Sequence, residues 1–227
     1  MNHKKKFFFL GKKSIHTLLG FVMAAAVIIP GLSGCLRDGG PSFQDGDLWV
    51  RQTAAADNAS GRNVMWQSRR EMKGASLDYR KTDGGEVMHA DAESSFYTGS
   101  GGKEPVSYWI YTVRLRELVP DTAYEYRIRS GEETGPWHPM KTDGGGSFEV
   151  LVYPDSQFTD PGVWKNTAQQ GFKQHPEAAF FVNMGDLVDN GQNIGQWKSW
   201  MDGAEGIIDR LIYSVYIRLC LFAGPAE

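Results

Sequence analysis

Between residues 46 and 143 the chain is a succession of short extended segments separated by turns, and this pattern constrains the fold most strongly. The segments alternate apolar and polar residues or are rich in aromatic residues, and Gly-rich clusters at 83–85 and 99–102 separate them. The segments expected to be strands are 48–50, 63–67, 76–80, 86–90, 107–115 and 124–129. Short strands at this spacing are typical of an all-β sandwich, and Trp66 is expected in its core.

The pattern changes after the glycines at 144–146, which indicate a linker. Two nearly continuous apolar runs follow, of the kind buried in a parallel sheet, with a helix expected between them. Asp160 is positioned as the N-cap of that helix and Pro161 lies in its first turn. The expected elements are strand 148–153, helix 163–175, strand 178–184, helix 194–210 and strand 211–217. The first three form a βαβ unit.

The first 35 residues have the layout of an export signal. Five Lys residues and no acidic residue precede an apolar run from Thr17 to Pro30, which is too short and too interrupted for a permanent span. Leu32-Ser33-Gly34-Cys35 resembles the bacterial lipobox, which implies cleavage after residue 34, a lipid on Cys35 and attachment to the outer face of a membrane. The alternatives are an ordinary secretory signal with a chance Cys, or an uncleaved anchor.

Charge and cysteine content limit the partners and the stabilisation. Removing residues 1–34 leaves 19 basic and 27 acidic side chains, a formal net charge of −8, which argues against a nucleic-acid partner. Cys220 is the other cysteine, so no internal disulfide is expected. The 193 mature residues suffice for one ordinary domain plus part of another. Residues 35–45 are expected to be a tether.

The sandwich carries a resemblance to a known family. In residues 118–127, Leu118 and Pro120 precede Tyr124 as in the fibronectin type III fold, where such a Tyr can form a tyrosine corner. Together with residues 108–115, this segment resembles the N-terminal domain of purple acid phosphatase-like enzymes. His138, beside Trp137, is expected either in a ligand pocket or at a packed strand edge.

Acidic residues follow both apolar strands of the second segment. Asp155 comes just after the first strand and Asp186 just after the second. Ligand sites of parallel sheets lie beyond the carboxyl ends of the strands, and neighbouring strands are about 4.8 Å apart. Two close carboxylates repel each other unless a proton or a cation compensates, and oxygen-rich sites suit divalent metals. The alternative is that residues 185–191 form only a turn.

Asp155-x-Gln157 together with residues 185–191 resembles the first two motifs of the calcineurin-like metallophosphoesterases. The resemblance implies a pair of divalent metals (Fe, Zn or Mn) that polarise a phosphate ester and generate the attacking hydroxide. It makes Asp155 a ligand of the first metal and Asp186 the bridging ligand. Gln157 stands where many members have His, and its amide oxygen would be the weaker ligand. Asp189 stands where purple acid phosphatases have Tyr, so their colour is not expected.

The third motif of that family, Gly-Asn-His, is not found after Asp186, and no His follows that residue. The expected fold is therefore a fibronectin III-like sandwich (46–143) followed by an incomplete α/β metallophosphoesterase domain (147–227). We expect a C-terminally truncated chain that is inactive toward the phosphate esters its family hydrolyses. The alternative function is a non-catalytic adhesion or carbohydrate-binding module. Exposed Trp and Tyr in a row would favour it, and burial of Trp66 and Trp109 would weaken it.

Overall fold

The computed structural model describes residues 48–100 and 105–215, and all of these belong to one compact unit. Cys35, with the expected signal and tether, lies outside the described residues, as does Cys220.

Within the described ranges, no helix combines the length and the apolarity needed to cross a membrane.

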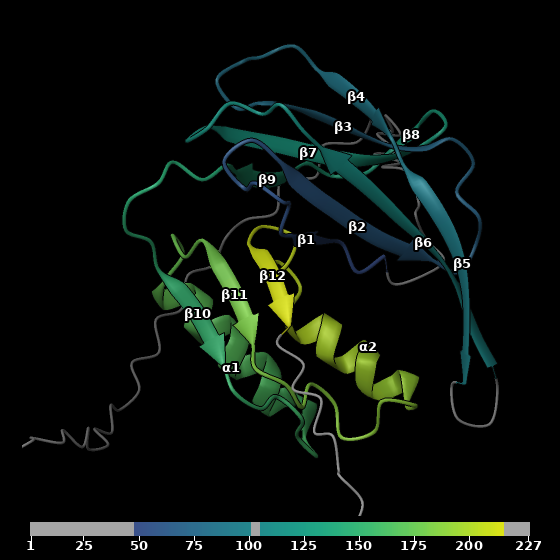
Figure 1. Ribbon diagram of the computed structural model, residues 1–227. Helices are drawn as coiled ribbons and strands as arrows, with labels where there is room; N and C mark the ends of the chain where they lie inside the picture. The colour runs from purple at the N-terminus through teal and green to yellow at the C-terminus, as the bar shows by residue number, and fades with distance from the viewer. Residues whose placement is uncertain (1–47, 101–104, 216–227) are drawn as a thin grey trace, which may run out of the picture. The chain divides into compact units, whose positions relative to one another are not determined.

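The described residues between 51 and 141 form a β-sandwich of two antiparallel layers (Figure 1). One layer has the order β1-β2-β6-β5, and the other has the order β4-β3-β7-β8, with β9 also paired to β7. The strands are β1 (Arg51–Thr53), β2 (Arg62–Ser68), β3 (Ala75–Lys81), β4 (Met88–Asp91), β5 (Glu93–Ser100), β6 (Pro105–Leu115), β7 (Ala123–Ser130), β8 (Glu133–Thr134) and β9 (His138–Lys141). The expected β-sandwich is confirmed.

The sandwich core is built from residues that alternate along the strands. Trp66 is fully buried and stacks on Tyr111 with ring centroids 5.4 Å apart. Tyr124 is 2% exposed, and its hydroxyl accepts a hydrogen bond from the Val119 amide at 3.0 Å. The predicted core position of Trp66 and the predicted tyrosine corner at Tyr124 are therefore both confirmed.

Two sequence predictions about strands differ from the structure. Residues 48–50 do not form a strand, since the first ladder begins at Arg51. β5 was not predicted, because its sequence is polar apart from Phe96 and Tyr97 and ends among glycines. It is an edge strand that pairs with β6 alone, and an edge strand needs no continuous apolar pattern.

The second segment runs through three parallel strands and two helices. Its elements are β10 (Val150–Tyr153), α1 (Pro161–Gln174), β11 (Phe180–Asn183), α2 (Ile194–Gly203) and β12 (Ile212–Val215). The strands lie in the order β10-β11-β12, so right-handed crossovers place both helices on the same face (Figure 1). Trp164 of α1 stacks on Trp200 of α2 with centroids 5.2 Å apart.

The helix ends follow from local sequence. The Asp160 side chain accepts a hydrogen bond from the Gly162 amide, which confirms the predicted N-cap of α1. The prediction that α2 extends to residue 210 is wrong, because the helix ends at Gly203 and Gly206 has a φ of +76°. A Cβ at Gly203 would lie 2.6 Å from Trp164 Cδ1, so the glycine also permits the close helix contact.

The two segments share one sheet. β12 pairs in parallel with β1 of the sandwich, in the register Gln52↔Ile212, which extends the sheet to β10-β11-β12-β1-β2-β6-β5. The Gln52 side chain is fully buried and donates to the carbonyls of Pro139 (2.9 Å) and Asp209 (2.8 Å). Tyr126 also donates to the Asp209 carbonyl, at 2.7 Å. Nothing in the sequence pattern predicted this junction.

Candidate functional site

The carboxyl ends of β10 and β11 bring the two predicted acidic segments together. Tyr153 pairs with Asn183 at the last step of the parallel ladder. Beyond it, the amides of Ser156 and Gln157 donate to the Asp186 carbonyl at 3.1 and 2.9 Å. The backbone around Asp155 is therefore fixed against the backbone of Asp186. Both aspartate side chains are exposed.

A buried polar network supports these strand ends. Ser156 Oγ accepts hydrogen bonds from Asn183 Nδ2 and from Trp200 Nε1, both at 2.8 Å. Asn183 Oδ1 in turn accepts from the Gly185 amide at 3.1 Å. Ser156 and Asn183 are 2% and 0% exposed, so this network links β10, β11 and α2 away from solvent. Sequence reasoning missed both residues, although a polar Asn at the end of an apolar strand was a usable signal.

Asp186 has an unusual backbone conformation. Its φ is +42°, and the preceding Gly185 has a φ of +128°. A left-handed conformation is uncommon outside glycine, although Asp tolerates it better than most residues, and it costs about 1–3 kcal/mol. Together with the two amides that bind its carbonyl, this conformation fixes the direction in which the Asp186 chain leaves the strand.

Gln157 contributes an amide oxygen that lacks a partner. Its Oε1 is buried, and no hydrogen-bond partner for it occurs among the described residues. An unpaired buried acceptor costs about 1–3 kcal/mol, so a cation or a donor at this position would be stabilised. Gln157 lines a cavity of about 420 Å³, together with Asp189 of the loop after β11.

The oxygen ligands that these side chains offer are of the type that a divalent metal prefers, but they are too few to fill its coordination shell. Carboxylates and an amide oxygen are the ligands that hard cations prefer. Over residues 48–100 and 105–215, however, no group of three or more His, Cys, Asp or Glu side chains is arranged to hold a metal ion. The described residues offer the exposed carboxylates of Asp155 and Asp186 and the buried amide oxygen of Gln157, whose cavity neither aspartate lines.

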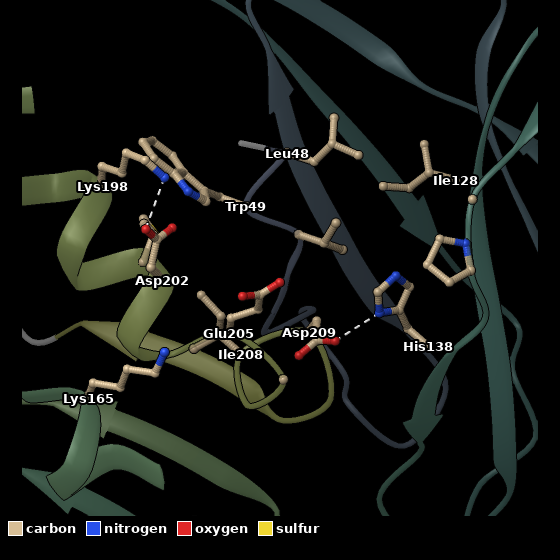
Figure 2. Close-up of a pocket in the computed structure, with 15 residues that line it drawn as sticks. Leu48, Trp49, Ile128, His138, Lys165, Lys198, Asp202, Glu205, Ile208 and Asp209 are labelled. Atoms are coloured by element: carbon tan, nitrogen blue, oxygen red, sulfur yellow. Dashed lines mark hydrogen bonds and ion pairs between the residues drawn. The ribbon is translucent and has the colours of Figure 1, made fainter. Parts of the chain in front are cut away.

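The histidines of the described chain bind carboxylates elsewhere. His89 contacts Asp78 and His175 contacts Glu149, with Nδ1 to carboxylate distances of 3.0 and 3.2 Å. His138 lies at the start of β9, stacked on Tyr126 with its Nδ1 2.8 Å from Asp209 Oδ2. Figure 2 shows this His138–Asp209 pair at the margin of a cavity of about 550 Å³. His138 is therefore both at a packed strand edge and beside a pocket.

Comparison with known proteins relates the sandwich to one family. Residues 50–142 match the family described as the purple acid phosphatase N-terminal domain. A search of curated proteins found no match.

Two solved structures show the same fold over a larger part of the chain. A purple acid phosphatase from yellow lupin (Lupinus luteus) seeds is 18% identical, with a TM-score of 0.62, over 74% of this chain and 34% of that one. PhoD is 9% identical, with a TM-score of 0.50, over 77% of this chain and 39% of that one. The chain thus spans between a third and two fifths of these proteins. The sandwich match relates residues 50–142 to the purple acid phosphatase N-terminal domain, and the two structures show a shared fold over about three quarters of the chain.

Proposed function

We propose that this chain derives from a lipid-anchored metallophosphoesterase and that residues 147–227 are the first part of the catalytic domain. The observation that carries the proposal is the junction of Asp155 and Asp186, whose segments are joined by two backbone hydrogen bonds beyond adjacent parallel strands. The match of residues 50–142 to the purple acid phosphatase N-terminal domain supports it independently. The substrate class would be phosphate esters.

Each of the site residues would have its own role in holding the metals. Asp155 would hold one divalent metal and Asp186 would bridge two, with Gln157 Oε1 as a weaker oxygen ligand. Such metals, Fe, Zn or Mn, supply charge stabilisation for a phosphate group and activate water. Ser156 and Asn183 would position the ligands through their buried network. The related family uses His ligands from later motifs, and no His follows His175 in the given sequence. We therefore propose that these 227 residues bind metal weakly and are catalytically inactive.

Metal binding is the test of this assignment. The full chain is titrated with Mn²⁺ and the free ion is followed by electron paramagnetic resonance. Asp155→Asn and Asp186→Asn should each weaken binding by at least about tenfold, the equivalent of about 1.4 kcal/mol. Asp83→Asn removes an exposed carboxylate from a turn of the sandwich and should change nothing. Equal binding by all four proteins would refute the site.

Hydrolysis tests the inactivity. The chain should show no turnover of p-nitrophenyl phosphate with added Mn²⁺, Zn²⁺ or Fe²⁺. Turnover that disappears in Asp186→Ala would show that these residues alone form a working centre.

The anchor is tested separately. We propose that Cys35 carries a lipid and holds the protein on the extracytoplasmic side of a bacterial membrane. Cys35→Ser should abolish incorporation of radiolabelled palmitate and move the protein from the membrane fraction to the soluble fraction. Unchanged fractionation together with unlabelled wild-type protein would favour an uncleaved anchor.

The alternative function, adhesion through a row of exposed aromatic side chains on the sandwich, is not supported. Trp66 is fully buried, and Trp109 is partly buried against the sandwich core. These positions weaken the adhesion hypothesis in the form that the sequence predicted.

A further inference from the structure

Another cavity, of about 350 Å³, lies between the β5–β6 hairpin and the start of α2. Four aromatic side chains from separate elements line it: Trp49, Tyr97, Tyr108 and Trp197. Tyr97 and Tyr108 are paired across the two strands, and the Tyr108 ring lies 6.0 Å from that of Trp49 at an interplanar angle of 40°. The volume of this cavity is near the lower end of the range for small-molecule sites, about 300–1,000 Å³.

The cavity wall contains polar groups without partners. The hydroxyl of Tyr108, a residue only 5% exposed, and the buried Nε1 of Trp49 both lack a hydrogen-bond partner in the described part of the chain. Each such group costs about 1–3 kcal/mol unless something pairs with it. Both atoms are shielded from solvent, so a ligand that carries hydroxyl groups pairs with them only after the two side chains shift.

Trp49 is held in this wall by a strained backbone. Its φ is +42°, which for a bulky residue is a genuine outlier. The conformation is fixed by Arg51 Nη1, which donates to the Trp49 carbonyl at 3.0 Å, and by the Gln67 amide, which donates to the Leu48 carbonyl at 2.8 Å. Trp49 also borders the neighbouring cavity, where Figure 2 shows it near Lys198. Backbone strain of this kind clusters at functional sites, so Trp49 is a reason to consider this wall as a binding surface.

The polar groups of the cavity lining are neutral. Among the described residues that line it none is charged, and the amides of Gln67 and Gln192 complete the lining. A cation buried here would meet no opposite charge in this lining, whereas Arg69, outside the lining, has its guanidinium carbon over the Tyr108 ring, 5.6 Å from the ring centroid. Trp197 is fixed, since its Nε1 donates to the Gly191 carbonyl at 2.9 Å.

We propose that this cavity binds a neutral saccharide. Aromatic rings cover the apolar C–H face of a sugar, while amide, phenol and indole groups pair with its hydroxyls. A flat nucleobase is a poorer fit, because the rings of Trp49 and Tyr108 are tilted and form no parallel slot. The site requires no metal and no contribution from Asp155 or Asp186, so it stands independently of the phosphoesterase proposal.

Two adjacent residues on β5 provide a matched test. Tyr97 and Phe96 are 56% and 58% exposed, but Tyr97 lines the cavity whereas Phe96 packs against Trp109 at 5.1 Å. The full chain in detergent is titrated calorimetrically with tetrasaccharides of glucose, mannose, galactose and N-acetylglucosamine. At least one should bind, and Tyr97→Ala should weaken its binding about threefold to tenfold, because an aromatic contact contributes about 0.5–1.5 kcal/mol. Phe96→Ala should bind as the wild type does.

A second variant keeps the ring and removes a single atom. Tyr108→Phe deletes the unpartnered hydroxyl and should weaken binding of the same saccharide without lowering the midpoint of thermal unfolding, since removing a buried group that pairs with nothing in the described chain breaks no hydrogen bond. Binding of none of the tetrasaccharides would overturn the proposal. So would an equal loss in Phe96→Ala and Tyr97→Ala, or Tyr97-dependent binding of adenosine or uridine in place of the sugars.

Discussion

The sandwich and the β10–β12 segment bury their strands very differently. In the sandwich, two layers face each other across a shared core that includes Trp66 and Tyr126. In β10–β12, the helices cover one face, and the other face leaves Val150, Val152 and Met184 exposed at 39%, 56% and 45% among the described residues. Parallel sheets are normally covered on both faces. From this difference we expect the sandwich to be stable by itself and the second segment to depend on its junction with β1.

The largest expected effects come from removing one core Trp in each region. Trp66→Ala and Trp200→Ala should each lower the free energy of unfolding by about 3–5 kcal/mol, because both side chains are at most 2% exposed. The regions that lose protection from hydrogen exchange should differ between the two variants. Hydrogen exchange should show lost protection throughout the described chain for Trp66→Ala, but only in β10–β12 and the helices for Trp200→Ala. Loss of protection in β2–β7 of the Trp200 variant would show that the two regions unfold together.

The next effect is specific to the sandwich and depends on pH. Asp78 is 2% exposed; burial raises the pKa of its carboxyl, but hydrogen bonds from His89, Arg127 and Arg129 outweigh burial, and the net pKa is lowered below 3.8. Its stabilisation is thus fully present above the unfolded-state pKa and is lost as the pH falls through the lower folded-state value. Asp78→Asn should cost about 1.5–3 kcal/mol at pH 7, the usual range for hydrogen bonds to charged groups.

The measurement is urea unfolding of the wild type and Asp78→Asn from pH 7 to pH 2.5. The variant should lose less stability than the wild type below about pH 4, so the two curves converge. Glu93 and Arg114 form a more exposed pair at the edge of the sandwich, which makes Glu93→Gln the control, with little change at any pH. Parallel curves for the wild type and Asp78→Asn would contradict the assignment.

The sandwich was predictable because its signals are local. Alternating segments and the Leu118–Tyr124 pattern each depend on a few consecutive residues, and the structure confirms the core position of Trp66 and the tyrosine corner. The β1–β12 pairing joins residues about 160 positions apart, as the register Gln52↔Ile212 shows, and no local pattern encodes it. β5 was missed because an edge strand can be polar.

The candidate site likewise contains residues that local sequence predicted and residues that it did not. Asp155 and Asp186 stood out because they follow apolar strands, and Gln157 because of its place in the motif that resembles the family. The structure brings their backbones together without testing their role as ligands. Ser156 and Asn183 were missed because their importance lies in pairing with each other and with Trp200 on α2. Carbohydrate binding was named as an alternative function, but the position of the proposed cavity was not predictable, since its four aromatic residues come from four separate parts of the chain.

The smallest expected effect separates the junction from the sandwich by the same chemical change at two tyrosines. Tyr126→Phe removes the donor to the Asp209 carbonyl, and Tyr124→Phe removes the acceptor of the Val119 amide. Each should cost about 0.5–1.5 kcal/mol, the usual net value of a hydrogen bond. Burial, with Asp209 nearby, raises the pKa of Tyr126, so its hydroxyl stays a donor at neutral pH. Hydrogen exchange should then be faster in β12 for Tyr126→Phe but unchanged there for Tyr124→Phe. If both variants leave β12 equally protected, the β1–β12 ladder, Gln52 and the His138–Asp209 pair suffice to hold the second segment to the sandwich.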